Sequence, residues 1–300
     1  MKKIIILTFI FISILSFGQT EETIISGDTK LHYKSFGKGK PILIINGGPG
    51  MNSDGFAFIA EEISKFGYQT IIYDQRGTGK STLHNVNSET ITMDLMVDDI
   101  EILRKHLKIQ KWTIFGHSFG GILGTYYAFK HPEAIDKLIL SSSGGVNLKF
   151  LEYVSERMNN NLTKSENDSL ALIQEKFNSG DRTKELLEAR ANIIANAYVY
   201  DKTNASIIAK RLTQINFEIN SLVFENLQKI KFDCSKEFKK FKNPVLVIQG
   251  KNDIISTETA KEINATFPNS DLIILDKCAH YGWLDSKEIY LNSIQEFLKK

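Results

Sequence analysis

The sequence predicts an α/β fold, in which a mostly parallel sheet is flanked by helices and carries an inserted helical lid. Two observations lead to this prediction. Short, almost continuous apolar runs alternate with segments of helical periodicity in the first half of the chain and again near its end. A long stretch without any strand pattern separates these two parts. Strands that are apolar on both faces are typical of parallel sheets covered by helices on either side.

The expected strands and helices follow one another in alternation. The strands are predicted at 42–45, 70–73, 112–115, 137–141, 244–249 and 271–275. The helices are predicted at 54–66, 94–107, 120–130 and 286–298. Residues 31–35 alternate between apolar and polar side chains, which predicts an antiparallel strand at the edge of the sheet.

The lid is predicted at residues 146–242, a region rich in Asn, Glu, Lys and Leu that reads as several amphipathic helices with turn-like breaks between them. The α/β core would then consist of residues 19–145 and 243–300. An insertion between strands of an α/β sheet is expected over the carboxyl ends of the strands, where ligands bind. We therefore expect this segment to cover the substrate.

The N-terminus has the pattern of a secretory signal peptide. Lys2 and Lys3 precede an apolar run, and the small residues Ser16 and Gly18 occupy the −3 and −1 positions of a cleavage point before Gln19. The alternative is a retained membrane anchor, but the run is shorter than the roughly 20 residues of a bilayer span. We expect residues 1–18 to be removed, which predicts an exported protein, periplasmic or secreted, without stable membrane insertion.

The composition excludes several classes of function. The 300 residues are 42% apolar and 24% charged with a formal charge of +2, and no basic stripe indicates nucleic-acid binding. No metal-ligand cluster or phosphate-binding loop is found, so we expect neither a metal nor an organic cofactor. Cys234 and Cys278 could form one disulfide, but two buried free thiols are the favoured interpretation. The oligomeric state stays open.

A candidate nucleophile lies in Gly116-His117-Ser118-Phe119-Gly120-Gly121, which fits G-x-S-x-G between a predicted strand and a predicted helix. Glycines two residues either side of Ser118 leave room for a sharp turn that exposes its hydroxyl. The N–H group of Phe119, at the start of the helix, is the expected first donor to an oxyanion. His117 is expected to project to the other side of this turn.

A serine hydroxyl needs a neighbouring base, and His280 is the candidate because it follows the last predicted strand. Asp253 follows the preceding strand and gives the chain order nucleophile, acid, histidine. Asp271 and Asp276 are alternative acids, but both are close to His280 in the sequence. The predicted catalytic residues are therefore Ser118, His280 and Asp253, with the carboxylate orienting the imidazole.

A second oxyanion donor is expected in Asn46-Gly47-Gly48-Pro49-Gly50, the loop after the first central strand. Glycines let the backbone approach a substrate closely and turn its N–H groups inward. Gly48 is preferred over Gly47 as the donor.

With these motifs, the chain resembles the α/β-hydrolase superfamily from about residue 42 to its end. More narrowly, it resembles the proline iminopeptidase (prolyl aminopeptidase) branch. The resemblance rests on three segments in order: Gly47–Gly50, Asp74-Gln75-Arg76-Gly77-Thr78-Gly79-Lys80-Ser81, and the serine motif. Asp74 and Arg76 are expected to brace the site rather than to react.

The resemblance implies release of an N-terminal residue, commonly proline, from a small peptide by acyl transfer to Ser118 and then to water. It also implies acidic lid residues that hold the free amino group of the substrate. Glu218 and Glu225 are the candidates, because seven residues place them on one face of a helix.

Two departures weaken strict proline specificity. Asn46 stands where the branch usually has His, and His117 and Phe119 replace the Gly and Trp that usually flank the serine. The alternatives are a carboxylesterase or another acyl or carbon–carbon bond hydrolase, for which the substrate would be an ester or a related small molecule, and a non-catalytic ligand receptor. Ser118 disfavours epoxide hydrolases and haloalkane dehalogenases, whose nucleophile is Asp.

Overall fold

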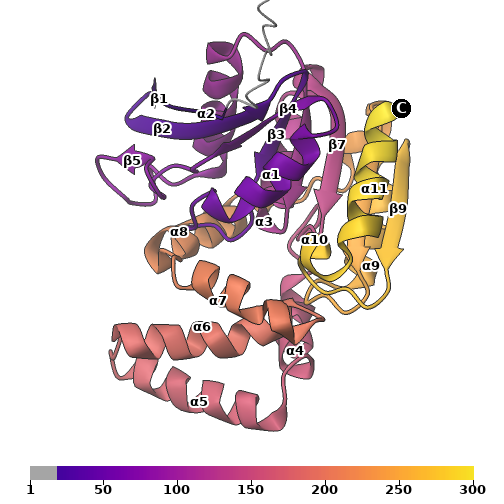
Figure 1. Ribbon diagram of the computed structural model, residues 1–300. Coiled ribbons are helices and arrows are strands. Elements are labelled where there is room, and N and C mark those ends of the chain that lie inside the picture. The colour runs from indigo at the N-terminus through magenta and orange to yellow at the C-terminus, as the bar shows by residue number, and fades with distance from the viewer. Residues whose placement is uncertain (1–18) are drawn as a thin grey trace, which may run out of the picture.

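A nine-stranded sheet runs through the computed structural model, which describes residues 19–300 (Figure 1). The strands are β1 (Thr20–Ser26), β2 (Thr29–Gly37), β3 (Lys40–Ile45), β4 (Tyr68–Tyr73), β5 (Thr82–Leu83), β6 (Trp112–His117), β7 (Ile135–Ser141), β8 (Val245–Gly250) and β9 (Ser270–Leu275). Their order is β1-β2-β4-β3-β6-β7-β8-β9, with β5 paired to β2. The six neighbouring strands β4, β3, β6, β7, β8 and β9 are parallel to one another. β2 is antiparallel to its partners β1, β4 and β5. The predicted fold class is confirmed.

The antiparallel strand predicted at 31–35 is present within β2, but it does not lie at the edge of the sheet. β1 pairs along it over seven residues and forms the edge instead. β1 has the sequence TEETIIS and is exposed at most of its positions. A solvated edge strand therefore lacks the apolar run by which the inner strands were found.

Helices cover both faces of the sheet (Figure 1). The flanking helices are α1 (Ala57–Ser64), α2 (Met93–His106), α3 (Phe119–Lys130), α9 (Thr257–Thr266), α10 (Gly282–Asp285) and α11 (Lys287–Lys299). The core consists of two large apolar clusters. Leu43 and Ile45 of β3 belong to the cluster that includes residues of α2, α3 and α9. Ile42 and Ile44 belong to the other cluster, which includes residues of α1 and α11. This burial on both sides explains why the strand is apolar at consecutive positions.

Between β7 and β8 lies a helical insertion, in the region predicted at residues 146–242. Its helices are α4 (Leu151–Asn160), α5 (Lys164–Asn178), α6 (Lys184–Tyr198), α7 (Ala205–Leu212) and α8 (Phe217–Lys229). Side chains at the helix starts define two of these boundaries: Thr163 and Glu166 form a capping box at α5, and Asn216 accepts a hydrogen bond from the Ile219 N–H at α8. Figure 1 shows the insertion at one end of the sheet, with α5 on its outer side.

Short 3₁₀ helices complete the fold at Asp54–Phe56, Pro132–Ala134, Lys202–Asn204 and Glu237–Lys240. Cys234 and Cys278 are buried and unpaired. Among the helices of residues 19–300, none is long and apolar enough to cross a membrane. The predicted signal peptide, residues 1–18, lies outside the described residues.

Candidate active site

Ser118 lies at the sharp turn between β6 and α3. Its backbone has φ 55° and ψ −121°, which a residue with a side chain adopts only under strain. The two neighbouring glycines are required by close packing: a Cβ at Gly116 would lie 2.4 Å from the Gly120 carbonyl oxygen, and one at Gly120 would lie 2.0 Å from that of Ile45. The G-x-S-x-G spacing therefore has a steric cause in this chain.

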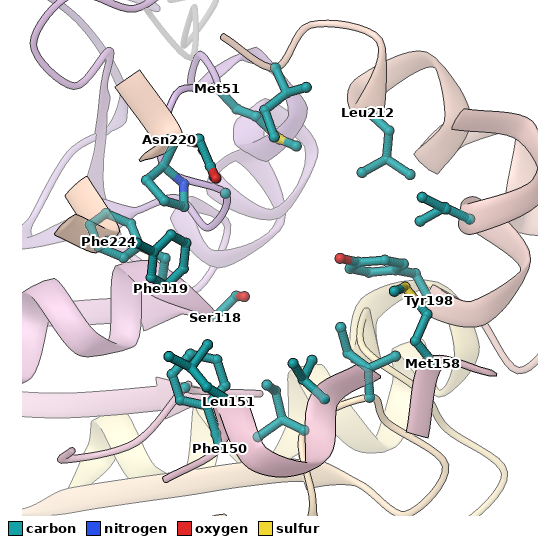
Figure 2. Close-up of a pocket in the computed structure, with 18 of the residues that line it drawn as sticks. Met51, Ser118, Phe119, Phe150, Leu151, Met158, Tyr198, Leu212, Asn220 and Phe224 are labelled. Atoms are coloured by element: carbon teal, nitrogen blue, oxygen red, sulfur yellow. Dashed lines mark hydrogen bonds between the residues drawn. The ribbon is translucent and has the colours of Figure 1, made fainter. Parts of the chain in front are cut away.

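The hydroxyl of Ser118 points into a cavity (Figure 2). It does not cap α3, although Ser118 occupies the N-cap position. The Ser118 carbonyl oxygen instead ties the turn together, accepting hydrogen bonds from the N–H groups of Gly121 at 2.9 Å and Gly144 at 3.1 Å. The N-terminus of α3 thus faces the cavity with its partial positive charge.

His280 and Asp253 form a buried pair. Nδ1 of His280 lies 2.7 Å from Oδ1 of Asp253, and neither side chain is more than 2% exposed. The Asp253 carboxylate also accepts hydrogen bonds from the Ile255 N–H at 2.9 Å and from Nε2 of Gln249 at 2.7 Å. Because a carboxylate accepts, Nδ1 carries the hydrogen, and Nε2 of His280 is left for another partner.

The two alternative acids lie elsewhere. Asp276 is exposed and pairs with Lys251, and Asp271 is exposed and pairs with Lys300. Neither forms a hydrogen bond with His280. Of the three candidate acids, Asp253 is the one that contacts the imidazole.

His280 also packs against the residue that precedes Ser118. The rings of His117 and His280 are 4.7 Å apart, and His117 also packs against Phe56 and Trp283 without lining the cavity. Burial holds the pKa of His117 well below its ordinary value, and the ring is therefore neutral near pH 7. No hydrogen bond joins the Ser118 hydroxyl to His280 in the described part of the chain.

The glycine loop after β3 lies directly beside the nucleophile. A Cβ at Gly47 would come within 2.6 Å of the Ser118 Cβ, and Gly48, with φ +70°, borders the cavity. The backbone N–H groups of Gly48 and Phe119 have no hydrogen-bond partner within residues 19–300. Both predicted oxyanion donors therefore have free N–H groups beside the cavity.

Two buried side chains hold this loop by its carbonyl groups. Gln75 donates from Nε2 to the Asn46 oxygen at 2.9 Å, and Arg211 donates from Nη2 to the Gly47 oxygen at 3.0 Å. Gln75 belongs to the Asp74–Ser81 motif, so this motif contacts the glycine loop through the side-chain amide that lies between Asp74 and Arg76 in the sequence. Neither role was predicted from the sequence, because Arg211 lies in an ordinary amphipathic helix and nothing in its pattern marks it.

The charged residues of the same motif form structural contacts. Asp74 accepts hydrogen bonds at 2.8 Å from the Ser53 N–H, the Ser53 hydroxyl and the Lys80 N–H. Arg76 forms two hydrogen bonds of 2.8 Å with the Asp99 carboxylate. Neither Asp74 nor Arg76 borders the cavity.

The cavity has a volume of about 380 Å³ and is lined by the glycine loop, the serine turn and the helical insertion (Figure 2). Most of its lining side chains are apolar, and the aromatic ones are Phe119, Phe150, Tyr198, Phe217 and Phe224. Arg190 is the one lining residue with a formal charge in the described chain. This volume suits a small organic ligand or a short peptide end.

Comparison with known proteins agrees with this geometry. Residues 40–287 match the family described as the alpha/beta hydrolase fold. The chain belongs to this family. The proline iminopeptidase of Lactobacillus helveticus (strain DPC 4571) is 27% identical over 269 residues, which covers 86% of this chain and 89% of the relative. The predicted resemblance to the proline iminopeptidase branch is confirmed.

Solved α/β-hydrolase structures share the whole architecture. The proline iminopeptidase of Mycobacterium smegmatis superimposes with a TM-score of 0.72 at 21% identity, covering 93% of this chain and 98% of that one. An esterase from Exiguobacterium antarcticum superimposes with a TM-score of 0.71 at 19% identity, covering 94% of this chain and all of the other. At these identities the likeness establishes the fold of this hydrolase.

Glu218 and Glu225 do not belong to the cavity of the hydrolase, contrary to expectation. Both side chains are exposed and neither lines the cavity. α8 presents Phe217, Asn220 and Phe224 instead, three residues at helical spacing. The glutamates do share a face, but each is one position further along the chain, about 100° around the helix from the lining phenylalanine.

Hydrogen bonds connect the helical insertion to the loops that carry Asp253, His280 and Gly47. Arg157 of α4 donates from Nε to the Asp253 carbonyl oxygen at 2.8 Å. The Tyr198 carbonyl oxygen, at the end of α6, accepts from the His280 N–H at 3.0 Å. Together with Arg211 of α7, these contacts join the insertion to the loops of the acid, the histidine and the oxyanion donor.

The described residues offer no ready metal centre. No group of three or more His, Cys, Asp or Glu side chains in residues 19–300 is arranged to hold a metal ion. The groups that border the cavity are the Ser118 hydroxyl and the free backbone N–H groups of Gly48 and Phe119. The buried His280–Asp253 pair packs beside the serine turn without lining the cavity.

Proposed function

We propose that the protein is a serine hydrolase in which Ser118 is the nucleophile, His280 the general base and Asp253 the acid that orients it. One observation carries the proposal: the buried Asp253–His280 hydrogen bond of 2.7 Å packs against the strained turn that presents Ser118 to the cavity. Hydrogen bonds between nucleophile and base are commonly loose without substrate and tighten in the substrate complex.

In the proposed reaction, Oγ of Ser118 attacks the substrate carbonyl while Nε2 of His280 takes its proton. The N–H groups of Gly48 and Phe119 stabilise the oxyanion, and the imidazolium returns the proton to the leaving group. Water, activated by the same imidazole, then releases the acyl group and regenerates Ser118. The Asp253 carboxylate stabilises the imidazolium at both stages.

The first candidate substrate is a small peptide with N-terminal proline or a similar residue. Its support is the set of sequence relatives, which are named proline iminopeptidases. In the described structure, however, no carboxylate lines the cavity that could pair with the free amino group of such a peptide.

The second candidate is an ester or another acyl compound without a positive charge. The cavity favours such a substrate. A cation that enters an apolar site loses its hydration, and without an anionic partner nothing offsets that loss. Arg190 adds a positive charge to the lining, which repels an ammonium group and attracts a carboxylate.

A substrate panel tests the function and separates the candidates. It compares a prolyl arylamide with a free amine, its N-acetyl analogue, and a short-chain aryl ester. Hydrolysis restricted to the free amine supports the first candidate, and preference for the ester or the blocked amide supports the second. Saturable binding without hydrolysis would indicate the receptor alternative.

Ser118→Ala is the decisive variant. It should abolish turnover of every cleaved compound while its circular dichroism and melting temperature match those of the wild type. Substantial hydrolysis by this variant would refute the proposed mechanism.

We also propose that the hydrolase is exported after cleavage next to Gly18. The support is the Lys-rich start, the apolar run and the small residues before Gln19. N-terminal sequencing of the mature protein should return Gln19 as the first residue, and recovery of Met1 would refute the proposal.

A further inference from the structure

Arg211 is a buried arginine without a carboxylate partner. It lies in α7, is 5% exposed, and forms no ion pair within residues 19–300. Its guanidinium donates to the Gly47 oxygen at 3.0 Å and to the Asn52 oxygen at 3.2 Å, and its central carbon lies 4.8 Å from the centre of the Phe56 ring. Burial lowers the pKa of this group, which shows that the surroundings oppose the charge.

Fold stability is a poor explanation for such a residue. A buried charge loses its hydration, and two carbonyl acceptors replace only part of it. An apolar side chain of similar length would fill the same space against Phe56 without that cost. The position of the charge in relation to the glycine loop offers another explanation.

The Gly47 oxygen and the Gly48 N–H belong to the same peptide group. In a trans peptide these two groups point in opposite directions, and the described chain contains no cis peptide bond. Arg211 and Nδ2 of Asn46, at 3.0 and 3.1 Å, hold the oxygen on one side of the loop. The N–H group is thereby fixed on the other side, where it has no protein partner and where Gly48 borders the cavity.

We propose that Arg211 is a positioning residue that fixes and polarises the Gly48 N–H as an oxyanion donor. The proposal rests on the function proposed above. A cation bound to a peptide oxygen withdraws electron density from that peptide, so its N–H becomes a stronger donor. The donor is also held in place before the reaction, which is what makes such donors effective.

Because Arg211 comes from the helical insertion, the insertion completes the oxyanion site as well as covering it. Gly55 makes room for this arrangement: a Cβ at residue 55 would lie 2.4 Å from Nη1 of Arg211. Gly55→Ala should therefore displace the guanidinium while leaving its charge in the molecule. It provides a test that does not alter Arg211 itself.

The experiment measures kcat and KM for the best substrate of the panel in Arg211→Met, Arg211→Lys and Gly55→Ala. The matched control is Arg182→Met, a change in an exposed insertion arginine that donates to the Phe177 carbonyl oxygen. Active-site titration with a fluorophosphonate counts the functional molecules. Inhibition by an arylboronic acid, which forms a tetrahedral adduct with the serine, reports on the oxyanion site separately.

Arg211→Met should lower kcat per titrated site by about 100-fold, the usual effect of losing one oxyanion donor, with little change in KM. Boronate inhibition should weaken in parallel. Arg211→Lys should recover part of the activity, because an ammonium can still donate to the Gly47 oxygen. Gly55→Ala should lower kcat in the same direction, and Arg182→Met should match the wild type.

Wild-type kcat in folded, titrated Arg211→Met would overturn the inference. If that variant does not fold, Gly55→Ala decides: unchanged kcat and boronate affinity overturn the proposal. The two proposals fail differently. An active Ser118→Ala would refute the hydrolase mechanism, whereas an inactive Ser118→Ala together with a fully active Arg211→Met would refute only the role of Arg211.

Discussion

Removing the guanidinium of Arg76 should destabilise the protein strongly while leaving the chemistry of the folded molecules nearly intact. In the structure, Arg76 donates twice to Asp99 at 2.8 Å and once to the Thr90 carbonyl oxygen at 2.7 Å. The side chains of Arg76 and Asp99 are 2% and 1% exposed. Arg76→Met would therefore leave a buried carboxylate with Ser26 as its remaining hydrogen-bond donor.

Breaking one side of a buried ion pair costs about 3–5 kcal/mol. For a protein of this size, that corresponds to a fall in melting temperature of roughly 6–20 °C. Burial already raises the pKa of Asp99, and hydrogen bonds and charge from Arg76 oppose that rise. Without Arg76 the pKa of Asp99 rises further, so the loss of stability should be smaller at pH 5 than at pH 8, where the unpaired carboxylate stays charged.

Urea denaturation at pH 5 and pH 8 measures this effect, with the fluorescence of the buried Trp112 and Trp283 as the signal. The double variant Arg76→Met, Asp99→Leu should recover much of the stability, because it leaves no unpaired buried charge. At 15 °C, kcat per titrated site should stay close to the wild-type value. A loss of stability below about 1 kcal/mol, or a much lower kcat in folded protein, would contradict this reasoning.

Three further predictions concern the site and the pH response. Asp253→Asn should lower kcat by about a thousandfold or more, because the amide no longer fixes the imidazole tautomer, whereas Asp276→Asn should not; equal activities would argue against this assignment. Burial by itself would raise the pKa of Glu101. Hydrogen bonds from Arg104 and Tyr127 outweigh this effect and lower the pKa from 4.5 to about 2. The resulting stability is present above pH 4.5 and is lost as the pH falls toward 2; Glu101→Gln should remove this pH dependence in urea titrations. Burial raises the pKa of both cysteine thiols to about 12, so a thiol reagent at pH 8 should label neither in the native protein and both in urea; one disulfide in a mass spectrum of the unfolded chain would contradict this.

The sequence predicted those parts of the molecule whose patterns have a direct physical cause. The inner strands were recognised because they are buried on both faces, and Ser118 because its turn tolerates only glycine at two flanking positions. Asp253 followed from the chain order of the fold and its place at the end of β8. β1 was missed because its exposed edge position permits polar residues.

Sequence spacing could not show which side of a helix faces the cavity. A separation of seven residues correctly placed Glu218 and Glu225 on one face, but the packing of α8 turns a different face inward. Arg211 could not be found by pattern, because its target is a backbone oxygen more than 160 residues away.

The attachment of the helical insertion to three loops restricts how a substrate can enter. If the entire segment swung outward as a rigid flap, it would pull on the backbone beside Asp253, His280 and Gly47 at once. Access by local displacement costs less. No hydrogen bond in the described chain joins α5 to the sheet or to its flanking helices. Ile173 and Phe177 of α5 form a small apolar cluster with Leu186 of α6, and Leu170 is the α5 side chain that packs against the large core. We therefore expect α5, which does not border the cavity, to move more easily than α4, α6, α7 and α8, which line the cavity and stay attached to its loops.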